Sequence, residues 1–290
     1  MNILVTGANG QLGTELRNAF RGSANHLIFT DVARLGDAET IYLDITNPDA
    51  VRLILESEKV DLVINCAAYV DVDRAEDDFA MADLLNRVAP GYLASVCKSL
   101  EATLIHISTD YVFGGEMSVP YREDCPPSPL GVYGATKAQG EKAIIDSGCK
   151  YIIFRTAWLY SPYGRNFVRT MRELTSGRPS LKVVCDQIGT PTYAADLAAA
   201  IVHVIASGQL SKTGIYNYTD EGVCSWYDLA CAVRDLSGNV CDIRPCRTDE
   251  YPTKARRPAY SVLDKSKVKA TFGLQIPSWY DSLVKCIARI

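Results

Sequence analysis

The sequence has no apolar run of membrane-spanning length, no excess of basic residues and no export signal, and each absence excludes a class of protein. Its longest apolar stretch, residues 197–206 of 290, is too short to cross a bilayer and carries His203. Lys and Arg total 30 against 34 Asp and Glu, a net charge of -4 that argues against nucleic-acid binding. Met1 leads directly into Ile3-Leu4-Val5 with no basic segment or cleavage site, so we expect a cytoplasmic protein.

Paired cysteine motifs are also absent. The ten cysteines are scattered without a Cys-x-x-Cys pair, and only three histidines accompany them. Structural zinc sites need closely spaced ligand pairs, so we predict no metal site. In a reducing compartment these cysteines should serve mainly as small apolar residues of the core.

Apolar runs of strand length alternate with helical patterns through the first 155 residues. The runs are continuous, which is typical of strands buried on both faces of a parallel sheet. Helical spacing between them predicts helices that begin near residues 12, 47, 80 and 131. Strands and helices in alternation predict an α/β fold with a Rossmann-type doubly wound parallel sheet. The predicted strands are residues 3–6, 27–31, 62–66, 104–108 and 152–155.

Three glycines follow the first predicted strand and precede a helix. Gly7, Gly10 and Gly13 would allow a tight turn, close approach of a pyrophosphate and close packing of the helix on the strand. The free N–H groups of the helix N-terminus would bind the phosphates. The second strand ends at Asp31, whose carboxylate could accept a hydrogen bond from an adenosine ribose hydroxyl. This order predicts an NAD(P)-binding Rossmann domain over residues 1–157.

The alternation of strands and helices becomes less regular after Trp158, where segments rich in glycine, proline, serine and tyrosine separate shorter elements. We therefore predict a second, smaller α/β domain, mainly residues 158–290, that closes over the carboxyl edge of the sheet and binds the substrate. A helix at residues 194–206 should return to the first domain, which a segment near residues 190–207 would complete.

Tyr133 and Lys137 form the spacing Tyr-x-x-x-Lys at the start of a predicted helix. Residues four apart share a helix face, so both side chains can face the carboxyl edge of the sheet, where α/β folds bind ligands. Reduction of a ketone needs a proton donor, and a phenol can serve. A nearby ammonium would bring the phenol pKa from about 10 towards neutral. A hydroxyl at Thr109 or Ser108, at the end of a strand, would hydrogen-bond the substrate oxygen.

The glycine spacing, Gly-x-x-Gly-x-x-Gly, resembles that of the extended short-chain dehydrogenase/reductase superfamily. Further motifs narrow the resemblance to the dTDP-4-dehydrorhamnose reductases, among them Ser-Thr-Asp-Tyr-Val-Phe from Ser108 and Asp-Gln-Ile-Gly-Thr-Pro-Thr from Asp186. The resemblance covers nearly the whole chain, from Asn2 to about Tyr280. Its motifs lie at residues 106–113, 121–143, 155–160, 186–192 and 257–263.

This resemblance implies reduction of the 4-keto group of dTDP-4-dehydro-β-L-rhamnose to dTDP-β-L-rhamnose by NADPH or NADH, the last step of dTDP-L-rhamnose biosynthesis. It implies a C-terminal domain that binds the sugar nucleotide. By position it implies Tyr133, Lys137 and Thr109 as the catalytic residues. The implied substrate-binding residues are Val72, Thr109, Asp110 and Trp158. The implied cofactor-binding residues are Gly7, Gly10, Gln11, Leu12, Gly13, Asp31, Asp44, Ile45, Ala67, Ala68, Tyr69, Val70, Tyr133 and Lys137.

The cofactor and the assembly are less well defined by the sequence. Asp31 favours a free ribose 2′-hydroxyl and so NADH, whereas Arg34 could bind the 2′-phosphate of NADPH. Cys66 departs from the family pattern, in which an alanine is usual. Some members bind Mg²⁺ through acidic residues at a homodimer contact. Glu15 and Asp196 match two of these positions without a third, so we do not expect a dimer linked by metal, although the resemblance leaves room for a homodimer and for Mg²⁺ without a catalytic role. We expect Glu15 to be a solvated first-turn helix residue.

Two alternative functions stay open. One is a non-catalytic NADP-binding regulatory subunit resembling that of methionine adenosyltransferase, which keeps much of the same pattern. The other is a different sugar-nucleotide ketoreductase or an epimerase. A 4,6-dehydratase is disfavoured because such relatives have Thr-Asp-Glu where this chain has Tyr111 in third position. Trp158 could stack on a sugar or belong to the core, and Arg257 could lie at the surface or clamp substrate phosphates.

Overall fold

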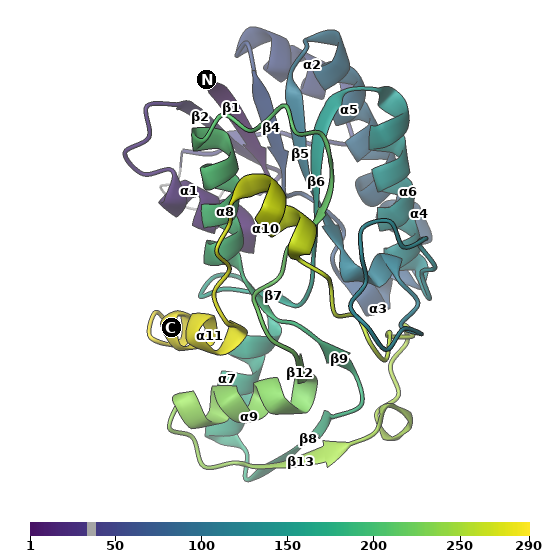
Figure 1. Cartoon of the computed structure of the whole chain (residues 1–290), viewed down its shortest axis with the longest axis vertical. Helices are drawn as coiled ribbons and strands as arrows, with labels where there is room; N and C mark the ends of the chain where they lie inside the picture. Colours follow the sequence, from purple (N-terminus) through teal and green to yellow (C-terminus); the bar gives the residue numbers. More distant parts are fainter. Residues whose placement is uncertain (34–38) are drawn as a thin grey trace.

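The computed structural model describes residues 1–33 and 39–290, and a parallel sheet forms its centre (Figure 1). Among these residues seven strands pair in the order β11-β6-β5-β4-β1-β2-β3, every pair parallel. The order reverses between β1 and β4, which is the ligand-binding point of a doubly wound sheet. The predicted fold class is therefore confirmed. The strands are β1 (Asn2–Thr6), β2 (His26–Asp31), β3 (Ile41–Tyr42), β4 (Leu62–Asn65), β5 (Thr103–Thr109), β6 (Lys150–Thr156) and β11 (Gly214–Asn217).

Helices cover both faces of this sheet because its strands are apolar on both faces. In β1, Ile3 and Val5 point into one core and Leu4 into the other. The first core is covered by α1 (Gln11–Ala19), α8 (Ala194–Ala206) and α10 (Ser266–Phe272). The second is covered by α2 (Pro48–Ser57), α5 (Ala89–Ser99) and α6 (Val132–Ser147). The short turns before and after α5 are α3 (Val72–Ala75), α4 (Phe79–Asp83), the π-helical turn η1 (Leu84–Val88) and the 3-10 turn η2 (Asp110–Val112).

The strand β11 belongs to the central sheet, although the sequence assigned its residues to the second domain. It pairs with β6, so that Tyr216 lies beside Phe154. The prediction missed it because the strand is only four residues long and begins with Gly214, which breaks the apolar pattern. The first lobe is therefore built from the N-terminal half together with α8, β11 and α10.

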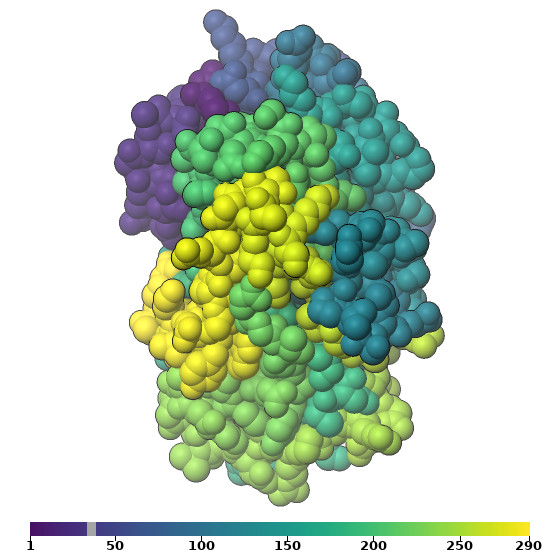
Figure 2. All heavy atoms as spheres, viewed as in Figure 1, coloured from purple at the N-terminus to yellow at the C-terminus, as the bar shows by residue number. Residues whose placement is uncertain are grey.

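A smaller lobe lies at the carboxyl edge of the sheet (Figure 1). Its apolar core is formed by α7, α9, α11 and the parallel pair β8–β13. The C-terminal residues lie across the front of both lobes (Figure 2). No helix in the described part of the chain has the length and apolarity needed to span a bilayer. The elements are β7 (Leu159–Tyr160), α7 (Phe167–Gly177), β8 (Ser180–Val184), β9 (Ile188–Gly189), β10 (Thr192–Tyr193), β12 (Cys224–Ser225), α9 (Trp226–Leu236), β13 (Asp242–Cys246), η3 (Thr248–Glu250) and α11 (Trp279–Ile287).

All ten cysteines are free thiols, and most of them fill the cores. Cys97 and Cys149 pack between the sheet and α5, and Cys286 packs in the smaller lobe. This agrees with their predicted use as small apolar residues. The six buried cysteines are Cys97, Cys149, Cys224, Cys241, Cys246 and Cys286.

A buried ion pair fixes α6 to the sheet. The Arg155 guanidinium donates to both carboxylate oxygens of Glu141, at 2.9 and 2.6 Å, and the two side chains are 2% and 3% exposed. Ser108 Oγ donates to the same carboxylate at 2.5 Å, and Arg155 Nη1 donates to the Glu123 carbonyl at 3.3 Å. A bidentate pair of this kind joins β5, β6 and α6 with defined geometry.

We expect Arg155→Met to lower the free energy of unfolding by about 3–5 kcal/mol, because it leaves the Glu141 carboxylate buried without a counter-charge. The double variant Arg155→Met/Glu141→Leu should recover most of that loss. Urea denaturation measures both. The matched control is Arg52→Met, which breaks a half-exposed pair with Glu56 and should cost less than about 1 kcal/mol. Equal losses for the buried and the exposed pair would contradict the assignment.

Candidate active site

Four of the predicted catalytic and substrate-binding side chains come together at the carboxyl edge of β5. Thr109 is the last residue of β5, and Asp110 begins the following turn. Thr109 Oγ1 donates to Asp110 Oδ1 at 3.0 Å, and the Tyr133 phenol is hydrogen-bonded to Thr109. Lys137 lies one turn further along α6 and is 2% exposed. The phenol and the hydroxyl are therefore neighbours, and the amine lies one helical turn away at the same edge of the sheet.

Two glycines allow α6 to lie this close to the edge of the sheet. A Cβ at Gly134 would overlap the Tyr111 carbonyl oxygen, and a Cβ at Gly140 would overlap the Asn86 carbonyl oxygen. The helix therefore packs against backbone rather than against side chains. Tyr133, Lys137 and Glu141 are spaced by four residues on one face of α6, so the ion pair of Glu141 also sets the height of the catalytic pair.

The lysine and the phenol have shifted pKa values because both are buried. Burial lowers the pKa of Lys137 to about 8, with the Glu141 charge acting in the opposite direction. Burial raises the pKa of Tyr133 to about 12, while its hydrogen bond with Thr109 opposes the rise. The expectation that Lys137 brings the phenol towards neutral is therefore wrong for the protein alone. Desolvation of the phenolate is the largest cause, Lys137 is not among the groups that shift this pKa, and the phenol holds its proton at neutral pH.

Ser108 does not take part in the cluster of hydroxyls. Its Oγ is turned to the Glu141 carboxylate, so of the two hydroxyls that the sequence left open only Thr109 faces the phenol. The reason is the strand geometry, in which neighbouring side chains point to opposite faces of the sheet.

Asp110 offers an acceptor that nothing in the described part of the chain satisfies. Its Oδ1 accepts from Thr109, whereas its Oδ2 is buried and has no hydrogen-bond partner. Burial raises the pKa of this carboxyl to about 6, and the nearby hydroxyls of Ser261 and Thr109 limit the rise. A buried unpaired acceptor costs about 1–3 kcal/mol, so its presence beside Tyr133 points to a hydroxyl or amide donor of a ligand.

The glycine turn has the shape that a dinucleotide requires. Gly7 has φ +61°, and a Cβ there would lie 2.7 Å from the backbone nitrogen of Ala67. Gly13 packs against the backbone of Ala8, whereas at Gly10 the one contact within 4 Å is the Gly7 carbonyl. No side chain of the described residues caps α1, so its first N–H groups stay free for a pyrophosphate. The residues present therefore fit NAD(P), and the free N–H groups include those of Gln11 and Leu12.

The two acidic positions of the predicted cofactor site are already engaged within the protein. Asp31 accepts from the backbone N–H groups of Asn9 and Ala33, both at 3.0 Å. Asp44 Oδ1 accepts from the backbone N–H and the hydroxyl of Thr46, at 2.9 and 2.7 Å. Each carboxylate retains lone pairs, since an ionised carboxylate can accept about four hydrogen bonds. Ile45 is buried in the core, and Arg34 lies outside the described residues.

Residues Ala68, Tyr69 and Val70 follow β4 and are held by a residue that the sequence did not single out. Asn86, fully buried in η1, accepts from the Tyr69 N–H at 2.9 Å and donates to its carbonyl at 3.1 Å. It also donates to Thr136 of α6 at 3.2 Å. In the sequence, the available signal for a role of Asn86 was its place as a polar residue in the middle of an apolar helical stretch. The structure adds a π-helical turn, a feature that is frequent at functional sites.

The predicted substrate residues do not all meet in one place. Val72 and Tyr133 line the same small cavity, together with Ala255 and Pro258 of the C-terminal half. Trp158 instead stacks on Trp226 of the smaller lobe, with ring centroids 3.6 Å apart, so one face of its indole is covered.

Arg257 is a half-buried partner of Asp73 rather than a free surface cation. Its two terminal nitrogens donate to the Asp73 carboxylate at 3.2 and 2.6 Å. Lys254 forms a second ion pair with Asp77. These pairs join the C-terminal half to α3, beside the cavity that contains Tyr133.

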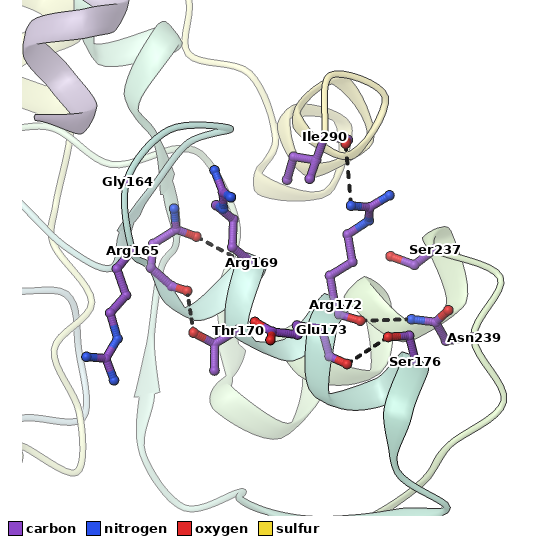
Figure 3. A pocket seen from close by; sticks show the side chains of 11 residues that line it. Gly164, Arg165, Arg169, Thr170, Arg172, Glu173, Ser176, Ser237, Asn239 and Ile290 are labelled. Atoms are coloured by element: carbon purple, nitrogen blue, oxygen red, sulfur yellow. Dashed lines mark hydrogen bonds between the residues drawn. The ribbon is translucent and has the colours of Figure 1, made fainter. Parts of the chain in front are cut away.

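A cavity of about 780 Å³ in the smaller lobe lies apart from this cluster (Figure 3). Its arginines point in different directions. The Arg172 side chain reaches the Ile290 carbonyl at 3.4 Å, whereas Arg165 points away from Arg169 and Arg172. Since the guanidinium groups do not converge, they form no common anion site, and the catalytic side chains do not line this cavity.

Glu15 corrects an expectation, because it is buried and not solvated. Its side chain is 2% exposed, and Arg289 from the C-terminal end donates to both of its oxygens, at 2.9 and 3.3 Å. Asp196 accepts from Ser282 at 2.5 Å. Among the described residues, no group of three His, Cys, Asp or Glu side chains is arranged to hold a metal ion. The sequence could not show this pair, because its partners lie at opposite ends of the chain.

Comparison with known families and proteins gives full-length matches. A family described as the RmlD substrate binding domain matches residues 1–290. A dTDP-4-dehydrorhamnose reductase of Burkholderia thailandensis is 38% identical over 301 residues, which cover 99% of this chain and 98% of the relative. A probable dTDP-4,6-dihydroxy-2-methyloxan-3-one 4-ketoreductase of Streptomyces antibioticus is 41% identical and covers 98% of this chain and 93% of its own.

Solved structures match equally well. A dTDP-4-dehydrorhamnose reductase from Clostridium acetobutylicum superimposes with a TM-score of 0.93 at 41% identity, covering 99% of each chain. The enzyme of that name from Bacillus anthracis, in complex with NADP, gives 0.88 at 34% identity and covers 99% of this chain and 98% of its own.

The raised pKa of Asp110 predicts a pH-dependent stability. Between about pH 4 and 6 the folded protein keeps a proton that the unfolded chain releases, so the Asp110 contribution becomes less favourable as the pH rises through this window. Asp110→Asn cannot ionise. Its stability relative to wild type should increase from about pH 4.5 to about pH 7.5 by about 2 kcal/mol, because one pKa unit corresponds to about 1.4 kcal/mol and part of the shift lies below pH 4.5.

Urea unfolding at the two pH values measures this difference. Asp124→Asn is the control, because Asp124 is 73% exposed and paired with Arg122 only at the surface. If Asp110→Asn and Asp124→Asn shift in parallel with pH, Asp110 is not the buried acid described here.

Proposed function

The chain belongs to the RmlD substrate binding domain family, and from that premise we propose that it is an NAD(P)H-dependent oxidoreductase. Its reaction is reduction of the 4-keto group of dTDP-4-dehydro-β-L-rhamnose to dTDP-β-L-rhamnose. The observation that carries the proposal is the buried cluster of Tyr133, Thr109 and Lys137 at the edge of the sheet, next to the glycine turn. The relatives carry reductase names, which favours catalysis over a regulatory NADP-binding subunit.

The cofactor would be bound along the reversal point of the sheet. The pyrophosphate would accept hydrogen bonds from the free N–H groups at the start of α1, after Gly10. The close-packed strand ends at Ala67 and Ala68 would leave a floor of small side chains beneath it. A relative with NADP bound supports NADPH as one cofactor, and the spare lone pairs of Asp31 are compatible with NADH. NAD(P)H, when bound, supplies the hydride for the substrate C4.

Tyr133 is the proposed proton donor. When the carbonyl carbon gains a hydride, the oxygen becomes an alkoxide, and the phenol proton moves to that oxygen. The Thr109 hydroxyl has one donor, which would turn from Asp110 to the same oxygen and stabilise the developing charge. The reaction leaves a phenolate in a buried site, where it is costly, and the Lys137 ammonium offsets that cost one helical turn away. A proton from solvent then restores the phenol.

The substrate sugar would bind between the two lobes. The unpaired Asp110 Oδ2 is suited to accept a hydrogen bond from a sugar hydroxyl. Val72 borders the cavity that contains Tyr133, and the partly exposed Trp158 could contact the sugar ring. One relative is named as a 4-ketoreductase of a different dTDP-sugar. This name indicates that relatives share the 4-keto chemistry while the sugar varies.

Tyr133→Phe removes only the phenolic oxygen, so we expect the fold to persist while turnover falls on the order of 10²–10⁴-fold, the usual contribution of a positioned acid. The assay follows NADPH absorbance together with the sugar product, using enzymatically prepared dTDP-4-dehydrorhamnose. Tyr216→Phe is the control, because its phenol bonds the Lys212 carbonyl remote from this cluster. Near wild-type turnover in Tyr133→Phe would remove this residue from the mechanism. A wild-type protein that binds NADPH but reduces no ketosugar would overturn the proposed function.

A further inference from the structure

A row of buried polar side chains runs across three strands and ends at Lys137. The register of the sheet places Thr6 of β1 beside Asn65 of β4, and Asn65 beside His106 of β5. Thr6 Oγ1 is 2.6 Å from Asn65 Oδ1, and Asn65 Nδ2 is 3.0 Å from His106 Nδ1. His106 Nε2 is 3.3 Å from Lys137 Nζ. The first three side chains are 1% exposed and that of Lys137 is 2% exposed, so the row is shielded from water.

The histidine is an uncharged partner of the lysine. Burial and the adjacent Lys137 hold the pKa of His106 well below its usual 6.5, so the ring is neutral at the pH at which the lysine is charged. The Ile107 carbonyl accepts from Lys137 at 2.5 Å as well. An ammonium has three donors, and these two acceptors leave one N–H for the side of Tyr133 and the cofactor.

The other titratable groups around Lys137 do not neutralise it. Glu141 lies on the same face of α6, but Arg155 binds both of its oxygens. Burial raises the pKa of Cys66 to about 12, so this neighbour is a neutral thiol. A carboxylate bonded to Lys137 would cancel the charge that stabilises the Tyr133 phenolate, whereas imidazole and carbonyl acceptors fix the amine and leave its charge effective.

The hydrogen bonds along this row can be oriented in two ways, and each orientation suits one protonation state of Lys137. With Thr6 donating to Asn65 and the amide N–H donating to Nδ1, the ring proton is on Nε2 and faces a neutral amine. If the Asn65 amide is turned over, it accepts from Nδ1–H, and Nε2 accepts from the ammonium. The imidazole can exchange these roles by moving its proton from one ring nitrogen to the other, without changing charge.

We propose that His106, fixed by Asn65, is a positioning residue of the reduction: its neutral ring holds the Lys137 side-chain nitrogen one helical turn from Tyr133 in both protonation states of the lysine. This inference rests on the proposed reductase activity. It assigns a role in the reaction to a polar row that lies outside the Tyr-x-x-x-Lys motif.

Replacement of the ring tests the proposal through the pH profile. His106→Leu removes an acceptor from the buried ammonium, so Lys137 should lose its proton at lower pH. The alkaline limb of ketosugar reduction should then move down by about one pH unit or more, the size expected for one hydrogen bond to a charged group. His106→Gln retains an amide acceptor and should keep the limb near that of wild type. If the alkaline limb of the pH profile does not move in His106→Leu, the proposal is contradicted.

Ser282→Ala is the matched control for stability alone. It removes a buried hydroxyl bonded to Asp196 at 2.5 Å, remote from the row. This variant should lower the unfolding temperature without moving the alkaline limb. If Ser282→Ala moves the limb as far as His106→Leu does, His106 has only a structural role.

A second measurement needs no turnover and separates this proposal from the proposed function. The chain has three histidines, so ¹⁵N-histidine spectra contain few signals and His106 can be assigned with His106→Gln. We expect its ring to stay neutral through the usual titration range of histidine and its Nε2 signal to shift in Lys137→Met. A His106 that titrates near 6.5, or that ignores Lys137→Met, overturns the positioning role. That result leaves the reductase assignment untouched.

Discussion

The buried pair between Glu141 and Arg155 is the interaction on which the catalytic geometry depends. It fixes α6 to β5 and β6 at a point two helical turns beyond Tyr133. Among the described polar contacts of α6 with the sheet, it is the one that joins two charged side chains in a bidentate geometry, whereas apolar contacts are not directional. The pair also occupies the carboxylate closest in sequence to Lys137, so that the lysine keeps its charge for the phenol. One ion pair therefore determines both the position and the electrostatics of the site.

The parts of the fold that the sequence predicted are those with a strong local signal. The five predicted strands are mainly apolar, and burial on both faces makes such runs recognisable. The glycine turn was recognisable because Gly7, Gly10 and Gly13 stand in a fixed order between a strand and a helix. The short strand β11 had no comparable signal. Its place is determined by pairing with β6, which is a contact between residues about sixty positions apart.

The site shows the same division between local and long-range information. Spacing alone placed Tyr133 and Lys137 on one helix face, and the strand end placed Thr109 near them. The choice between Thr109 and Ser108, the burial of Glu15 and the raised pKa of Tyr133 depend instead on partners elsewhere in the chain. Desolvation is a property of the assembled core, so no motif records it. The row from Thr6 to His106 was hidden for the same reason, since only the sheet register brings these residues side by side.

The return of the chain to the first lobe has a consequence for biosynthesis. α1 packs its apolar face against α8, and β6 is an edge strand until β11 pairs with it. A ribosome that has made the first half of the protein has therefore released a Rossmann lobe with an uncovered helix face and an open strand edge. Such surfaces promote aggregation of nascent chains. The lobe cannot complete its folding during synthesis until β11 and the residues that follow it in this lobe have emerged from the ribosome.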